Sequence, residues 1–156
     1  MAIYTDDKYR VKRNAEYQDD MLLLINNDIF PSYASVLMIS AIIGYLNNQY
    51  VPIVKQAQDG VQTSFFSEHD KDFIDFIAFA HTKKQKILGQ NGALEDGSTK
   101  YNIFESYANG GFPILLQKLK IDGDDIFDAK KTLLNYYHLL LTEDIDFESD
   151  PSDILI

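Results

Sequence analysis

The run VLMISAIIGYL at residues 36–46 constrains the fold more than any other part of the sequence. A helix with this composition is apolar on almost every side, so it must be surrounded by other elements. The run is well short of the roughly 20 apolar residues that a membrane-spanning helix needs. Pro31 suits a first helical position and predicts a central buried helix over residues 31–46. Its apolar members are Val36, Leu37, Met38, Ile39, Ile42, Ile43 and Leu46. Gly44 inside this helix costs roughly 1 kcal/mol relative to Ala, which predicts close packing by a neighbour.

Two further helices are predicted around this central one by their apolar spacing. Residues 15–27 carry Tyr17, Met21, Leu24 and Ile25 on one face. A later helix begins after Ser67, a residue type that caps helix N-termini. Acids in its first turn and lysines near its end follow the order that the helix dipole favours. We expect its inner face to consist of Phe73, Phe76, Ile77 and Ala80.

The segment IFESYANGGFPILLQKL at residues 103–119 interrupts a helical pattern with two glycines and a proline. Ser98 is the expected cap of this fourth helix. Asn109 and Gly110 resemble a helix stop, and Pro113 resembles the start of a new helix. We therefore predict a corner between two helices, formed by Tyr107, Asn109, Gly110, Gly111 and Pro113. The glycines are neither a phosphate-binding loop nor a dinucleotide fingerprint, because no Lys-Ser/Thr follows and no strand precedes.

A last helix is predicted after DGDD at residues 122–125, which gives about five helices in all. Strands are scarcely indicated, except for KYRVKR at residues 8–13. The expected fold is a compact, mainly α-helical single domain over residues 1–142, with a short N-terminal strand. Residues 143–156 form a separate acidic and apolar tail.

Charge and composition narrow the function classes. The net charge is −10. The sequence contains no Cys, and this absence excludes disulfides and thiolate chemistry and suits a reducing cytoplasm. The start lacks the apolar core of a signal peptide, so we expect a cytoplasmic protein without a membrane partner. Tight autonomous DNA binding is disfavoured by the overall acidity.

The basic arm at residues 8–13 leaves two interpretations open. In a ribbon-helix-helix dimer, the strand would pair with a second copy and contact DNA through Lys8, Arg10, Lys12 and Arg13. Alternatively, the arm is a solvated charged N-terminus, and any DNA contact is indirect or weak.

The tail TEDIDFESDPSDILI alternates acids with apolar residues, a composition that can dock on a basic, apolar partner. The expected partner-binding residues are Ile145, Phe147, Ile154, Leu155 and Ile156. The tail could equally solubilise the chain, or fold back on this domain or on a second copy.

Catalytic and metal-binding patterns are weak. His69, His81 and His138 lack the spacing of a metal site, and Asp122, Asp124, Asp125 and Asp128 do not match a calcium loop. The sequence does not indicate any catalytic set made of a nucleophile, a base and an acid that orients the base. We expect no catalytic residue, no metal and no cofactor. An enzyme that uses His69 or His138 would need a pocket that joins them to carboxylates.

Three pieces of the chain resemble the small accessory proteins encoded beside bacterial DNA phosphorothioation (Dnd) systems. These are IFPSYASVLMISAIIGYLNNQYVPI, DFIDFIAFAHT and FESYANGGFPIL, of which Tyr107 to Gly111 is the most distinctive. The resemblance covers residues 8 to 140 and carries no catalytic residue. It implies a context of DNA sulphur modification and defence against phage. We expect a non-enzymatic adaptor that binds larger subunits of such a system, with a homo-oligomer as a further possibility.

Overall fold

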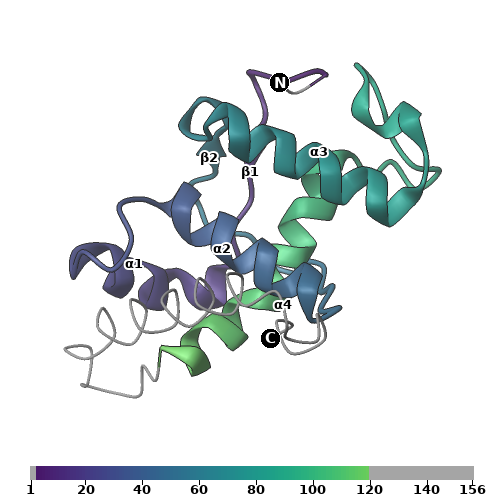
Figure 1. Ribbon diagram of the computed structural model, residues 1–156. Coiled ribbons are helices and arrows are strands. Elements are labelled where there is room, and N and C mark those ends of the chain that lie inside the picture. Colours follow the sequence, from purple (N-terminus) through teal and green to yellow (C-terminus); the bar gives the residue numbers. More distant parts are fainter. Residues whose placement is uncertain (1–2, 120–156) are drawn as a thin grey trace, which may run out of the picture.

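The computed structural model describes residues 3–119, in which four α-helices and one pair of short strands form a mainly helical fold (Figure 1). The helices are α1 (Gln18–Asn26), α2 (Tyr33–Leu46), α3 (Glu68–Thr82) and α4 (Lys100–Lys118). The strands are β1 (Arg10–Val11) and β2 (Val61–Gln62), with short 3-10 turns at Ala15–Tyr17, Thr63–Phe65 and Gln85–Leu88. The expected mainly α-helical class with a short N-terminal strand is confirmed.

Helix α2 lies at the centre of the fold and packs most extensively against α4. Val36, Leu37 and Ile43 are buried on it, as its apolar run predicted. Its Gly44 lies against α4, where a Cβ atom would overlap the carbonyl oxygen of Tyr107. The predicted close neighbour of Gly44 is therefore confirmed.

The predicted corner at residues 109–113 is wrong, because α4 continues without a break from Lys100 to Lys118. Gly111 lies within this helix and faces α2, where an added Cβ would overlap the carbonyl oxygen of Ser40. The exposed Pro113 lacks the N–H that would bond the carbonyl four residues earlier, yet the helix passes through it. Close packing with α2 outweighs the local preference of this stretch for a helix end.

Helix α3 packs on α4 through a face different from the predicted one. Ile74, Ile77 and Ala78 are buried, whereas Phe76 is exposed. The orientation is fixed by a buried ion pair in which Lys100 Nζ lies 2.7 Å from Asp75 Oδ1. Because Asp75 must face α4, the neighbouring Phe76 faces outward.

The predicted N-terminal strand exists, but it pairs within its own chain. Arg10 and Val11 are antiparallel to Gln62 and Val61. The pairing continues beyond the strands, since Ala57 N donates to the carbonyl of Arg13 and Ala15 N to that of Lys55. The ribbon-helix-helix interpretation required pairing of this strand with a second copy, whereas here it pairs with residues 55–62 of the same chain.

The helix ends follow side-chain chemistry. Ser67 caps α3, as expected, and also forms a reciprocal capping box with Asp70. The cap of α4 is Thr99 with Asn102, one residue after the predicted Ser98.

The predicted last helix and the tail lie outside the described residues. Among residues 3–119, no helix has the length and apolar character required to cross a membrane.

Candidate protein-docking surface

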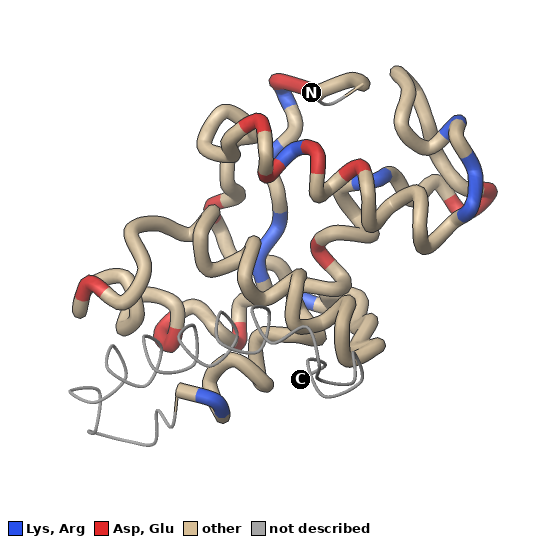
Figure 2. Tube along the Cα trace, viewed as in Figure 1, with Lys and Arg blue, Asp and Glu red and all other residues tan. Residues whose placement is uncertain are grey.

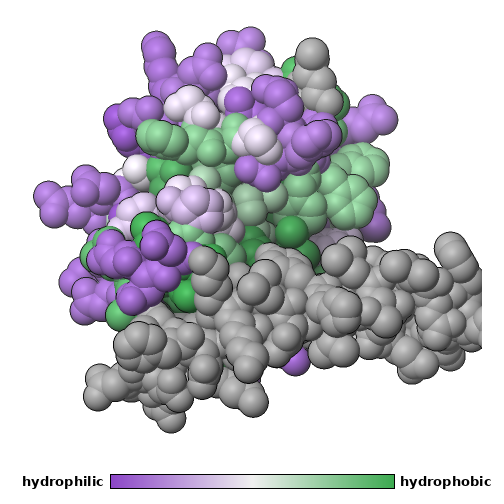
Figure 3. Space-filling view, turned by 60° about the vertical axis from the view of Figure 1, so that its left-hand side comes forward, coloured by the Kyte–Doolittle hydropathy of each residue, from purple (hydrophilic) through white to green (hydrophobic). Residues whose placement is uncertain are grey.

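An aromatic surface lies where the outer side of α3 meets the end of α2. Phe76 and Phe79 are 56% and 40% exposed. The ring of Tyr45 on α2 makes an edge contact with Phe76 at 5.9 Å, and Phe73 lies 6.4 Å from Phe76. We call Tyr45, Phe73, Phe76 and Phe79 the aromatic face. Figure 3 shows a band of apolar side chains on the surface, with hydrophilic residues above it.

A network of ring contacts joins the aromatic face to the buried Tyr107, the half-buried Tyr50 and the exposed His81. His81 Nδ1 lies 2.8 Å from the hydroxyl of Tyr107, and Tyr50 stacks on the imidazole at 4.5 Å. Tyr107 also contacts Tyr45 edge-on at 5.6 Å. Burial raises the pKa of Tyr107, so its hydroxyl stays protonated near neutral pH. Tyr45 is therefore held by contacts on both sides, and the aromatic face has a rigid base.

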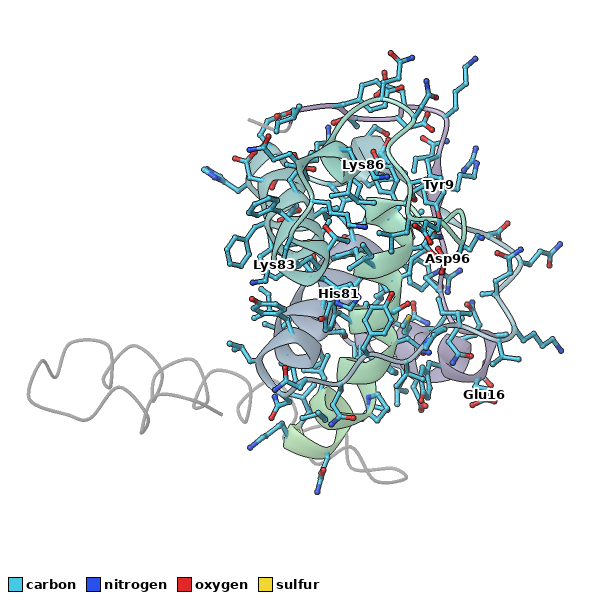
Figure 4. All side chains as sticks on the ribbon, turned by 90° about the vertical axis from the view of Figure 1, so that its right-hand side faces the viewer. Tyr9, Glu16, His81, Lys83, Lys86 and Asp96 are labelled. Atoms are coloured by element: carbon cyan, nitrogen blue, oxygen red, sulfur yellow. The ribbon has the colours of Figure 1, made fainter. Side chains whose placement is uncertain are left out.

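The charges around α3 are separated along the helix. Glu68 and Asp70 lie in its first turn, while Lys83, Lys84 and Lys86 follow its end and are exposed. Figure 2 shows this change from acidic to basic positions. In Figure 4, Lys83 lies at the edge opposite Tyr9 and Asp96, with His81 between them. The aromatic face thus has a basic border at one end.

A second candidate is a polar cleft of about 520 Å³ on the other side of α4, with Glu105 in its wall. Glu105 is only 4% exposed. Its carboxylate accepts hydrogen bonds from the Tyr9 hydroxyl, the Lys12 N–H and Asn102 Nδ2 at 2.7, 2.7 and 3.1 Å. Burial raises the pKa of Glu105, and these hydrogen bonds oppose the rise. Because three donors already engage the carboxylate, Glu105 anchors β1 to α4 rather than offering a free group to a ligand.

The four predicted DNA-contact residues lie in different environments. Lys8, Arg10 and Lys12 have exposed side chains, whereas Arg13 is buried. The blue positions of this segment run down the middle of Figure 2. The structure therefore does not bring the four cations together on one open surface.

The predicted corner residues, apart from the exposed Pro113, are buried packing residues of α4. Tyr107 bonds His81, and Asn109 Nδ2 donates to the carbonyl of Val51 at 2.8 Å. Gly110 lies against the backbone of Gln49.

The sequence analysis does not predict the aromatic face, because it places Phe73 and Phe76 on the inner side of their helix. The three-residue spacing of the phenylalanines could have indicated a separate stripe.

The histidines do not gather at one place. His69 and His81 lie at opposite ends of α3, and His138 is outside the described residues. Within residues 3–119, no three His, Asp or Glu side chains are placed to hold a metal ion. The predicted partner-binding residues of the tail also fall outside the described part.

A comparison with protein families matches residues 10–148 to DNA sulphur modification system-associated protein 4. The chain belongs to this family. No curated protein and no solved structure matches it. The description of the family associates its members with a DNA sulphur modification system and names no reaction. The expected resemblance to Dnd-associated accessory proteins is confirmed.

Proposed function

We propose that this protein is a non-enzymatic adaptor of a bacterial DNA sulphur modification system with a role in defence against phage. It acts by binding a larger, DNA-handling protein of the same system in the cytoplasm. Its own contact with DNA is then indirect. The observation that carries this proposal is the exposed aromatic face on α2 and α3.

The aromatic face has the properties of a binding hot spot. Aromatic side chains are enriched where protein interfaces gain most of their free energy. Phe76 and Phe79 leave much of their rings in water, which costs free energy that a partner would recover. The contacts of Tyr45 with Tyr107 and Phe76 preorganise the surface, so little side-chain entropy is lost on binding.

The charge of the chain suggests the chemistry of the partner. The net charge is −10, and the tail at residues 143–156 adds acids and aliphatics without a single basic residue. A protein that handles DNA carries basic surfaces, to which these acids are complementary. We propose that the aromatic face supplies affinity and that the acidic tail, through Ile145, Phe147, Ile154, Leu155 and Ile156, supplies a second contact.

The test is co-purification with the proteins encoded beside this gene, expressed together with a tagged full-length chain. The double substitution Phe76→Ser and Phe79→Ser should weaken capture of the partner by tenfold or more, or about 1.4 kcal/mol. Phe65→Ser is the matched control, because Phe65 is 68% exposed and lies outside the aromatic face. It should leave capture unchanged.

The proposal would be contradicted if the double variant, still folded by circular dichroism, captured the partner as well as the unmodified chain does. Deletion of residues 143–156 tests the second contact separately. The deletion should weaken capture of the partner. The capture that remains should be less sensitive to salt, because the lost contact is largely electrostatic.

A further inference from the structure

Arg13 is a buried cation surrounded by neutral acceptors. The residue is 3% exposed. Its guanidinium donates to the side-chain oxygen of Gln18 and, at 2.8 Å, to the main-chain carbonyl of Asp59. The same group lies 3.8 Å above the ring of Tyr33. In the part of the chain that the structure describes, no carboxylate forms an ion pair with it.

This arrangement leaves a positive charge without full compensation. Buried charges are normally paired, since removing an ion from water costs several kcal/mol. Arg13 Nε is also buried without a hydrogen-bond partner. Burial lowers the pKa of Arg13, and Tyr33 and Asp59 oppose the change. A guanidinium nevertheless remains protonated in proteins, so the charge persists.

A cleft of about 420 Å³ opens beside Arg13. The residues that line it carry one guanidinium, one ammonium and three carboxamides, of which the Gln18 amide already donates to the hydroxyl of Tyr33 at 3.2 Å. The lining residues are Arg13, Ala15, Gln18, Lys55, Gln56, Ala57, Gln58 and Asp59. The volume is in the range of small-ligand sites.

The walls of the cleft are fixed by main-chain pairing. Ala57 N donates to the carbonyl of Arg13 at 2.7 Å, and Ala15 N donates to that of Lys55 at 2.9 Å. Asn14 and Gln56 form an antiparallel bridge between these two bonds. The two segments that carry the donors are therefore held at a fixed separation, as a preorganised site requires.

We propose that this cleft binds a phosphate group, with Arg13 supplying positive charge at its base and Lys55 at its exposed edge. Several donors around one cation suit an anion with several acceptor oxygens, and arginine is the residue most often used for this purpose. The carboxylate of Asp59 partly opposes binding, which keeps the site weak. The inference rests on residues outside the aromatic face, and a DNA source of the phosphate would add a direct DNA contact to the adaptor role.

The experiment is calorimetric titration of the full-length protein with inorganic phosphate, at an ionic strength kept constant with chloride. Lys55→Gln should weaken binding about fivefold, the upper end of what one exposed charge contributes. Asp59→Asn should strengthen binding by a similar factor, because its main-chain carbonyl still accepts from Arg13. Lys84→Gln, an equal change of charge on an exposed residue after α3, should have no effect. None of these three variants removes a buried side chain.

Arg13→Lys tests the base of the cleft, with circular dichroism to establish that the variant folds. It should weaken phosphate binding even though the charge is kept, because the planar donor arrangement is lost. No measurable binding by the unmodified protein would overturn the proposal. So would equal losses in Lys55→Gln and Lys84→Gln, which would indicate a general effect of net charge.

Two added competitors identify the source of the phosphate. A short DNA duplex that displaces phosphate, and binds more weakly to Lys55→Gln, would assign the cleft to a nucleic-acid backbone. A nucleoside monophosphate that displaces phosphate while the duplex does not would assign it to a small ligand. Either result supports a phosphate site.

Discussion

Glu105 joins the β1 segment to α4, and its contribution to the stability of the fold depends on pH. Its carboxylate holds the hydroxyl of Tyr9 and the backbone of Lys12 against α4. The same burial that makes these bonds strong raises the pKa of Glu105 above its ordinary value of 4.5. Burial and the nearby Glu105 carboxylate also raise the pKa of Tyr9, so the phenol remains a donor.

We predict that Glu105→Gln changes how stability depends on pH. Because the folded-state pKa of Glu105 is raised, the folded protein binds more protons than the unfolded chain above pH 4.5. The contribution of Glu105 is therefore fully present below that pH and declines as pH rises through the folded-state pKa. Urea unfolding at a series of pH values should show the unmodified protein losing stability relative to Glu105→Gln as pH rises. A constant difference across the series would contradict the assignment.

At the scale of helices, the crossing of α2 and α4 depends on glycine in both partners. Gly44 and Gly111 let the two backbones approach more closely than any side chain would permit. This contact explains why a stretch that locally resembles a helix end remains helical. Burial of α2 on several sides stabilises the crossing, and the missing N–H of Pro113 is tolerated at an exposed position.

We predict that Gly111→Ala destabilises the protein by about 3 kcal/mol, because its methyl group would overlap the carbonyl of Ser40 and force the helices apart. The midpoint of urea unfolding should fall while the slope stays the same. Gly89→Ala is the matched control, since its Cβ would come no closer than 3.9 Å to the carbonyl of Lys86. The control should change stability by less than about 0.5 kcal/mol. Equal effects of the two substitutions would show that the close crossing is unimportant.

At the scale of the whole molecule, the N-terminal segment connects elements distant in sequence. Ile3 N donates to Asp75 Oδ2, and Lys100 Nζ donates to the carbonyl of Tyr4. Asp6 N donates to the hydroxyl of Tyr101, and its carbonyl accepts from Thr63. Residues 3–9 therefore belong to the folded domain and complete the polar contacts of the buried Asp75–Lys100 pair.

We predict that deleting residues 1–8 lowers the free energy of unfolding by roughly 2–6 kcal/mol. The truncated chain loses four hydrogen bonds, each of which contributes about 0.5–1.5 kcal/mol. Thermal unfolding measures the loss. Asp7→Ala, at an exposed residue of the same segment, is the control and should be nearly neutral. A truncated protein as stable as the full chain would mean that these contacts contribute nothing.

The sequence by itself determined the helical class, the central position of α2, the close neighbour of Gly44 and the capping of α3 by Ser67. These features depend on apolar spacing and on hydrogen bonds within a few residues, which are local properties of the chain. The resemblance to the family was likewise carried by short pieces of sequence.

Only the tertiary structure decided the continuity of α4, the rotation of α3 and the partner of β1. Each depends on a contact between residues distant in sequence: Gly111 with Ser40, Asp75 with Lys100, and Val11 with Val61. The free energy of such contacts exceeds the local preferences that a sequence pattern records. The aromatic face and the environment of Arg13 follow from them, because a residue's exposure is set by what packs around it.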